Sequence, residues 1–200
     1  MFAAAKFINL IAASAAVCIL FILGGIIMDY ILLVNENDEE IGVGEKMEVH
    51  KTGLLHRAFS IFVFNSENKL LLHKRALSKY HSGGLWTNTC CSHQRDGEDL
   101  YETIHRRLKE EMGFDCDLQE AFTLKYRAEL DKGLIENEID HVFIGEYDGE
   151  VIINPDEVDE YAWVTLNDVI LEVENSPEKF TYWFRLLIGI VNKYVEANVT

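Results

Sequence analysis

The chain has 200 residues, of which 48% are hydrophobic and 26% are charged, and this composition predicts a globular protein rather than a disordered one. Its formal net charge of −16 excludes the usual nucleic-acid-binding proteins, because phosphate backbones are bound by basic surfaces. A small phosphorylated ligand remains compatible with this charge, since a few basic side chains and a divalent cation can form a local anion site.

The N-terminal segment differs from the rest of the chain. Residues 7–27 are almost purely apolar, and about 20 apolar residues suffice for a helix to cross a bilayer. Three interpretations are open: a transmembrane anchor, a cleaved secretory signal with Lys6 as its basic residue, or an upstream stretch before a true start at Met28. We therefore expect an apolar segment at residues 1–27, with membrane contact through it as one alternative, and one domain at residues 28–200.

Short β-rich runs follow Met28. They contain β-branched and aromatic residues and are bounded by polar or glycine-containing turns. The strands predicted in chain order are residues 30–34, 58–64, 69–73, 121–128, 137–147 and 161–164. The polar stretch 65–68 predicts a hairpin between the second and third of these, and Gly83 and Gly84 predict a loop.

Two amphipathic helices are predicted among these strands. In residues 98–112 the apolar side chains recur every four positions, and Gly113 is expected to end the helix. The second helix lies near the C-terminus, with an apolar stripe from Phe180 to Val191. Strands before and after one central helix, with another helix at the end, predict an α/β (α+β) domain in which a mixed β-sheet is sandwiched between helices.

Three histidines and two glutamates could bind one divalent metal ion. Glu136 and Glu138 are two residues apart on a predicted strand, so their side chains point to the same face. His50 and His56 precede a predicted strand, and His93 is predicted to lie in a loop. Three imidazoles and two carboxylates suit Zn or Mn, although the spacing alone does not bring the five residues together. The remaining histidines are interpreted as ordinary surface or core residues: His73, His81, His105 and His141.

A reactive cysteine is expected beside one of these histidines. Cys91 precedes His93 by two residues in the predicted loop, where a thiol can act chemically. A small buried apolar side chain is the alternative, which stays open for Cys91 and is preferred for Cys90 and Cys116. Because adjacent cysteines without a Cys-x-x-Cys pair are a poor disulfide framework, we expect free thiols and a cytoplasmic domain.

An acidic pair closes the predicted central helix. Glu110 and Glu111 lie in its last turn, where negative charge opposes the helix dipole. Magnesium binding and a solvated charged face are both open explanations for this pair.

Several linked segments resemble the type I isopentenyl-diphosphate isomerases, a Nudix-like family. They occur in the family's order and at its approximate spacing, from about residue 29 to the terminal helix. The segments are LLHRAFSIFVFN (54–65), KRALSKYHSGGLWTNTCCSH (74–93), RRLKEEMGF (106–114), YRA (126–128) and ENE (136–138).

The resemblance implies a Nudix-like metalloenzyme of isoprenoid biosynthesis. Such an enzyme converts isopentenyl diphosphate into dimethylallyl diphosphate by protonation and deprotonation through a carbocation-like state. Cys91 and Glu138 would be the catalytic pair, assisted by Tyr126. One Mn or Zn ion would be bound by the five residues His50, His56, His93, Glu136 and Glu138.

The resemblance also implies how the substrate is bound. Mg would be held by Glu111 together with the substrate diphosphate, and Trp183 would face the hydrocarbon end of the substrate. The basic residues that would contact the diphosphate are Lys46, Arg75, Lys79 and Arg107. The expected partner is therefore a small prenyl diphosphate, and no nucleic acid is expected.

The wider Nudix pattern GX5EX7REUXEEXGU, in which U is aliphatic, is not fully matched. Placed on residues 92–114, it finds Ser92 in place of the first glycine and Arg107 in place of a glutamate. Nudix hydrolases use that carboxylate in the metal cluster that drives attack of water on a diphosphate, whereas a cation there would bind the diphosphate and leave it intact. The pattern thus favours the isomerase over a Nudix-type diphosphate hydrolase. A membrane-anchored metal-binding module without catalysis, built on the N-terminal segment and the His/Glu cluster, is the third hypothesis.

Overall fold

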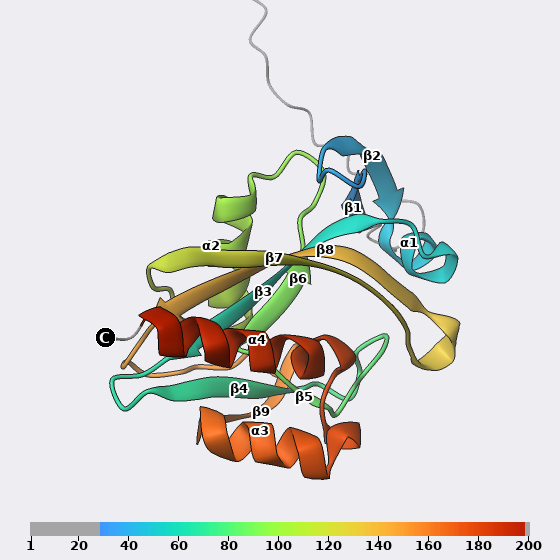
Figure 1. Cartoon of the computed structure of the whole chain (residues 1–200). Helices are drawn as coiled ribbons and strands as arrows, with labels where there is room; N and C mark the ends of the chain where they lie inside the picture. The colour runs from blue at the N-terminus through green and yellow to red at the C-terminus, as the bar shows by residue number, and fades with distance from the viewer. Residues whose placement is uncertain (1–28, 199–200) are drawn as a thin grey trace, which may run out of the picture.

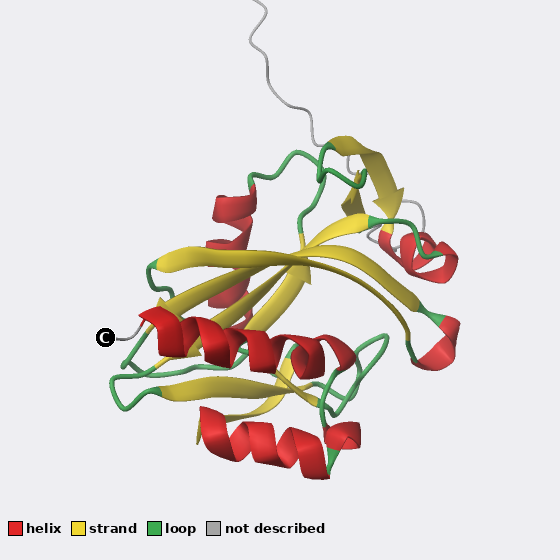
Figure 2. Cartoon of the chain, in the orientation of Figure 1, coloured by secondary structure: helices red, strands yellow, loops and turns green. Residues whose placement is uncertain are grey.

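A curled, nine-stranded β-sheet forms the centre of residues 29–198, which are the residues that the computed structural model describes (Figure 1). Helices flank the sheet on both sides (Figure 2). The strands are β1 (Tyr30–Val34), β2 (Glu40–Glu45), β3 (His56–Phe64), β4 (Lys69–Arg75), β5 (Trp86–Thr87), β6 (Cys90–His93), β7 (Leu118–Glu129), β8 (Ile135–Glu146) and β9 (Val158–Thr165). The helices are α1 (Lys46–Thr52), α2 (Leu100–Met112), α3 (Leu166–Asn175) and α4 (Tyr182–Asn198), with 3-10 turns η1 (Asp131–Gly133) and η2 (Pro177–Lys179). The predicted α+β fold, a mixed sheet between helices, is confirmed.

The apolar segment predicted at residues 7–27 lies outside the described residues. Within residues 29–198, no helix is both long enough and apolar enough to span a membrane. The described chain starts at Asp29, immediately before β1, where the Asp29 carboxylate contacts the side chains of Lys46 and Arg95.

Strand β3 occupies the middle of the sheet. It runs parallel to β8 and antiparallel to β1, β4 and β6, while β7 pairs with the far edge of β8. The predicted hairpin is confirmed at its turn, where the N–H of Asn68 donates to the carbonyl of Asn65 and Asn68 has a φ of +56°. Beyond the Phe64–Leu70 pair the two arms diverge, because β3 pairs with β6 and β8 whereas β4 pairs with β9.

The two faces of β3 belong to different apolar clusters. Phe59 and Ile61 pack against the α2 side, in a cluster that includes Ile104. Phe62 points the other way and stacks on Phe184 of α4 with ring centroids 6.2 Å apart. Burial on both faces is typical of a strand with a parallel neighbour and explains the continuous apolar sequence of β3. The N-terminal part of the Phe62 face is polar, and it forms the floor of the site described below.

The predicted central helix is confirmed at both ends. The side chain of Asp99 accepts hydrogen bonds from the backbone N–H groups of Tyr101 and Glu102, which makes Asp99 the N-cap of α2. Gly113 ends the helix with a φ of +77°, a conformation that favours glycine. The C-terminal helix α4 begins at Tyr182, two residues after the predicted apolar stripe starts at Phe180.

The strands β2, β5 and β6 and the helices α1 and α3 were not predicted from the local pattern. The expectation that Cys91 and His93 lie in a loop is wrong, because both belong to β6. A strand of four residues is too short to show a detectable alternation, and β6 forms because it pairs antiparallel with β3. His50, expected only to precede a strand, lies on the short helix α1.

We predict that Gly113→Ala destabilises the fold more than a matched glycine substitution. An added Cβ at Gly113 would overlap the carbonyl oxygen of Ile152, whereas Gly97 has a similar φ of +72° and no described atom within 4 Å of its Cβ position. Gly97→Ala should therefore cost about 1 kcal/mol of unfolding free energy, and Gly113→Ala about 3 kcal/mol. Urea unfolding of the full-length variants measures both values, and equal losses would contradict the predicted overlap.

Candidate functional site

Polar side chains share one face of β3, β6, β7 and β8. Residues paired across neighbouring strands point to the same face of a sheet. His56 of β3 is paired with Glu138 of β8, and Tyr126 of β7 is paired with the same glutamate. Further along this face, Ser60 of β3 is paired with Cys91 of β6. The strand register therefore brings side chains from distant parts of the sequence into one row.

The five predicted metal-ligand residues meet at one end of this row. One potential ligand atom from each lies within 4.8 Å of the others, and all five side chains are buried. They come from α1, β3, β6 and β8, and they are His50, His56, His93, Glu136 and Glu138. Glu136 and Glu138 do share one face of their strand, as their spacing predicted.

The imidazoles direct their Nε2 atoms at the two carboxylates. Nε2 of His50 lies 3.2 Å from Oε2 of Glu136, and Nε2 of His93 lies 2.9 Å from Oε1 of Glu138. His56 stands between the carboxylates, with its Nε2 atom 3.6 Å from Oε2 of Glu136 and 3.3 Å from Oε1 of Glu138.

The remaining ring nitrogens are fixed by the backbone. Nδ1 of His50 donates to the carbonyl of Lys46 at 2.6 Å, and Nδ1 of His56 donates to the carbonyl of Leu54 at 2.9 Å. In neutral imidazoles these bonds leave each Nε2 atom free to act as a ligand. Nε2 of His56 and Oε2 of Glu136 are buried without a hydrogen-bond partner among the described residues. Such atoms are rare in proteins, and their chemistry fits a divalent metal ion.

The charges of the cluster shift one another's pKa values. Burial and the neighbouring charge of Glu136 raise the pKa of Glu138 to about 7. Burial also disfavours the ionised form of Glu136, but its contacts with His50 and His56 outweigh this effect and hold its pKa well below the usual range. Burial lowers the pKa of His56, yet Glu136 and Glu138 raise it overall to about 10. The two carboxylates therefore favour positive charge in the cluster, whether it comes from a protonated imidazole or from a bound cation.

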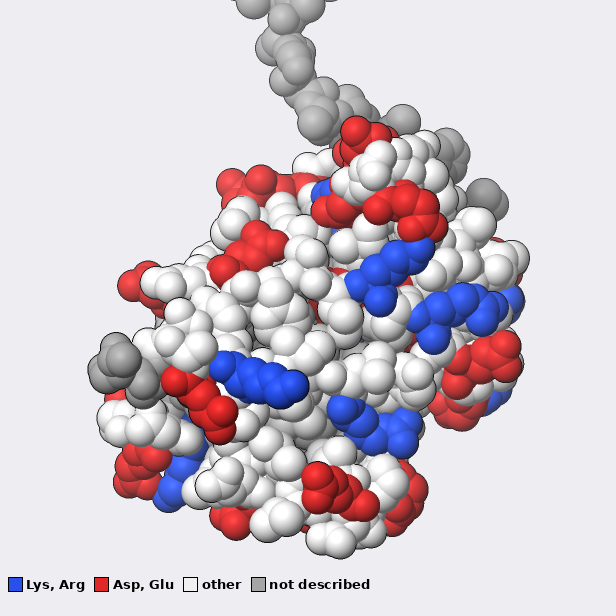
Figure 3. All heavy atoms as spheres, in the orientation of Figure 1, with Lys and Arg blue, Asp and Glu red and all other residues white. Residues whose placement is uncertain are grey.

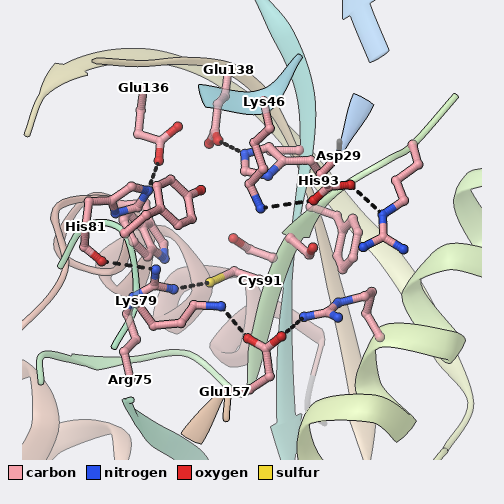
Figure 4. A pocket seen from close by; sticks show the side chains of 18 of the residues that line it. Asp29, Lys46, Arg75, Lys79, His81, Cys91, His93, Glu136, Glu138 and Glu157 are labelled. Carbon is pink, nitrogen blue, oxygen red and sulfur yellow. Dashed lines mark hydrogen bonds and ion pairs between the residues drawn. The ribbon is translucent and has the colours of Figure 1, made fainter. Parts of the chain in front are cut away.

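Basic side chains line the opposite end of the same pocket (Figure 4). On the outer face that carries α4, acidic and basic side chains are interspersed (Figure 3). Lys79 forms an ion pair with Glu157, and Arg107 donates to Glu157 at 3.1 Å and also to Glu111. Although burial raises the pKa of Glu157, Lys79 and Arg107 outweigh it and lower that pKa to about 2.

Cys91 lies between the two ends of the pocket. Its Sγ atom is 3.9 Å from Nη1 of Arg75 (Figure 4). The guanidinium group of Arg75 lies 5.2 Å from the ring centre of Trp183. Burial raises the pKa of the Cys91 thiol to about 12, despite the opposing charge of Arg75, so the thiol is protonated at neutral pH. Trp183 is buried in the first turn of α4, and its Nε1 atom has no hydrogen-bond partner among the described residues.

Lys46 is placed at the rim by two contacts. Its Nζ atom lies 3.6 Å from Oδ2 of Asp29 and 4.8 Å from the ring centre of Tyr80. Burial lowers the pKa of Lys46, and the charge of Asp29 partly opposes that shift. Lys46 thus approaches the pocket from α1, the helix that also carries His50.

The structure brings the predicted site residues to one place. Most of them line the pocket directly, whereas His50, His56 and Glu111 are buried and contact the lining residues Glu136 and Arg107. The lining residues among them are Lys46, Arg75, Lys79, Cys91, His93, Arg107, Tyr126, Glu136, Glu138 and Trp183.

Several pocket residues were missed by the sequence analysis, among them the charged or titratable residues Asp29, His81 and Glu157. Asp29 and Glu157 each stand one residue before a strand, a position that carries no periodic signal. His81 was interpreted as an ordinary histidine, yet its Nε2 atom lies 2.9 Å from Oε1 of Glu136. Its position two residues after Lys79, inside the segment 74–93, was the signal available for it.

The chain is similar in sequence to known proteins. The family model of the NUDIX domain matches residues 54–184. The chain is 54% identical over 163 residues to isopentenyl-diphosphate Delta-isomerase 2 of Photorhabdus laumondii, which covers 81% of this chain and 92% of the relative. It is 50% identical over 155 residues to the protein of the same name from Aromatoleum aromaticum, which covers 78% of this chain and 82% of the relative.

Solved structures show a similar fold at lower sequence identity. The protein DR0079 of Deinococcus radiodurans has a TM-score of 0.67 and 17% identity, and the match covers 80% of this chain and 97% of that protein. A MutT protein of Methanosarcina mazei has a TM-score of 0.58 and 21% identity, with coverage of 73% and 96%. At these identities the likeness concerns the fold alone.

We predict that the cluster binds a divalent ion and that Glu136→Gln weakens this binding by more than about tenfold, because a neutral amide replaces a carboxylate ligand. Elemental analysis of the dialysed full-length protein would measure the bound metal. Glu146→Gln provides a matched control, since Glu146 is exposed at the end of the same strand. Equal metal content in the wild type and the Glu136→Gln variant would show that the cluster is not the binding site.

Proposed function

The chain belongs to the isopentenyl-diphosphate Delta-isomerases of the Nudix family, and we propose that its pocket performs the isomerisation with Cys91 and Glu138 as the acid–base pair. As a member of that family, it converts isopentenyl diphosphate into dimethylallyl diphosphate. One observation carries the assignment of the pair: Cys91 and Glu138 lie on the same face of strands that flank β3, and both line one pocket.

The reaction sets the requirements for the pocket. One carbon of an unactivated alkene gains a proton and a different carbon loses one, so the path runs through a tertiary carbocation-like state. An alkene is a very weak base, and water would trap the cation. The site must therefore supply an acid and a base at separate positions, and it must exclude water.

The proposed acid–base groups occupy separate positions. On one side, Tyr126 donates a hydrogen bond of 2.6 Å to Oε2 of Glu138. Burial, followed by the charge of Glu138, raises the pKa of Tyr126 well above its usual value, so the Tyr126 hydroxyl is protonated at neutral pH. This hydroxyl could relay a proton between the substrate and Glu138. On the other side, the protonated thiol of Cys91 can exchange a proton with the substrate. One of the two groups gives the proton and the other removes it.

The metal cluster supports the role of Glu138. We propose that one Mn or Zn ion is held by the five clustered residues, whose mixed imidazole and carboxylate donors suit such an ion. The bound ion would supply the positive charge that sets the proton affinity of Glu138. The backbone bonds of His50 and His56 hold the two rings in the orientation that this binding needs.

The basic end of the pocket would bind the diphosphate. Lys79 and Arg107 are held side by side by Glu157, and Arg75 and Lys46 extend the positive charge along the wall. We propose that Mg binds between Glu111 and the substrate diphosphate, since Mg is usually bound by one or two carboxylates together with substrate phosphates. The hydrocarbon end would then reach Trp183, whose ring can stabilise developing positive charge by roughly 0.5 to 2 kcal/mol.

Arg107 disfavours hydrolysis of the diphosphate. The Nudix pattern has a glutamate at this position, and here the side chain is a cation that donates to Glu111 and Glu157. Burial opposes its charge, but the contacts with Glu111 and Glu157 raise the pKa of Arg107 further above its usual value, so it stays charged. A fixed cation holds a diphosphate but cannot act as a metal ligand.

The free thiols Cys90, Cys91 and Cys116 support our further proposal that the domain works in the cytoplasm.

Removing either member of the acid–base pair should abolish isomerisation. We expect Cys91→Ala and Glu138→Gln each to lower kcat by at least about a hundredfold, the usual contribution of general acid–base catalysis. Formation of dimethylallyl diphosphate in deuterated water, followed by NMR, measures the rate. Cys90→Ala is the matched control, because Cys90 is buried in the α2-side cluster, and that variant should keep most of its activity. Full activity of Cys91→Ala or Glu138→Gln would exclude that residue from the pair.

Loss of the Glu111 carboxylate should change the magnesium requirement. We expect Glu111→Gln to need about tenfold more Mg for half-maximal rate, while the metal content of the His/Glu cluster stays unchanged. Glu102→Gln is the control, since Glu102 is exposed on the same helix, α2. An unchanged Mg dependence in Glu111→Gln would rule out Glu111 as the magnesium ligand.

A further inference from the structure

His81 contacts Glu136 of the His/Glu cluster and Arg75 beside Cys91 (Figure 4). It is 2% exposed, and its Nε2 atom lies 2.9 Å from Oε1 of Glu136. The other oxygen of that carboxylate, Oε2, faces Nε2 of His50 and of His56. The two oxygens of Glu136 therefore have separate surroundings: one points into the metal-binding cluster and the other points at His81.

The position of His81 is fixed by the β7–β8 connection. Nδ1 of His81 lies 3.2 Å from Oγ of Ser82, and the backbone N–H of Ser82 donates to Oδ1 of Asp131 at 3.1 Å. Nζ of Lys132 donates to the carbonyl of Tyr80 at 3.1 Å. Asp131 and Lys132 belong to η1, which joins the strand that carries Tyr126 to the strand that carries Glu136. These contacts fix the position of His81 relative to β8, the strand that carries Glu136.

The same residue contacts the groups around Cys91. The backbone carbonyl of His81 accepts a hydrogen bond of 3.3 Å from Nη2 of Arg75, whose other terminal nitrogen approaches Cys91. The imidazole ring stands edge-on to Trp183, with centroids 5.8 Å apart and an interplanar angle of 82°. A shift of His81 would therefore move Arg75 and Trp183 as well as Glu136.

We propose that His81 is a positioning residue of this active site. Its imidazole fixes the orientation of Glu136 for metal binding, and its ring and carbonyl place Trp183 and Arg75 beside Cys91. Replacing a residue that contacts a metal-ligating side chain commonly lowers metal affinity by about 10- to 100-fold. The kinetic part of this inference rests on the proposed function, whereas the metal-binding part does not depend on it.

The experiment compares His81→Ala and His81→Gln in the full-length protein. We expect His81→Ala to lower the affinity for Zn or Mn about 10- to 100-fold, measured by competition with a chelator, and to alter the visible spectrum of the Co-loaded protein. With the metal site saturated, His81→Ala should still lower kcat more than it changes KM, because Trp183 loses the imidazole ring that stands edge-on to it. His81→Gln should regain metal affinity, since its amide N–H can contact Glu136.

His105→Ala is the matched control, because His105 is a surface residue that pairs with Asp115. It should change neither metal affinity nor kcat. Wild-type metal affinity and an unchanged Co spectrum in His81→Ala would overturn the proposal, as would the same loss of affinity in His81→Gln as in His81→Ala. If His81→Ala does not fold, the comparison of His81→Gln with His81→Asn decides, because the shorter amide cannot reach Glu136. Should the wild type fail to isomerise its substrate, the proposed function fails while the metal measurements still test His81.

Discussion

The burial of two carboxylates on one strand face is the constraint on which this site depends. Glu136 and Glu138 are 2% and 5% exposed, and burying two like charges is costly unless opposite charge and polar partners surround them. Strands β3 and β6 and helix α1 each bring one imidazole to the pair. This demand explains why the short helix α1, which buries few apolar side chains, is fixed against the end of β8. A divalent ion bound to these five residues would add to the positive charge that the histidines supply.

The pocket separates two kinds of electrostatic environment. At one end, carboxylates and imidazoles form a cluster that could hold a cation. At the other end, Lys79 and Arg107 carry positive charge and both form ion pairs with Glu157. In the proposed function, the anionic head of the substrate would be attracted to the basic end, and its short apolar tail would reach the thiol of Cys91. The acidic surface outside does not oppose this arrangement, since screening by salt is strong for exposed charges and weak for buried ones.

Local periodicity and linked motifs predicted much of the fold and the site. The apolar repeat of α2 and its stop at Gly113 are properties of the segment itself, and the two-residue spacing of Glu136 and Glu138 fixes their common face on any strand. The strand β6 could not be predicted in this way, because it exists through its pairing with β3. The importance of His81 was likewise hidden, since it arises from a contact with Glu136, 55 positions later in the sequence, which only the folded chain creates.

The dependence of the reaction on the buried cluster can be measured directly. The full-length protein would be stripped of divalent ions with a chelator, reloaded with Mn or Zn, and given isopentenyl diphosphate and Mg in deuterated water. We predict that the reloaded protein forms deuterium-labelled dimethylallyl diphosphate without releasing phosphate, and that the stripped protein forms almost none. Equal product formation by the stripped protein, or release of phosphate without rearrangement, would contradict a catalytic role for the cluster.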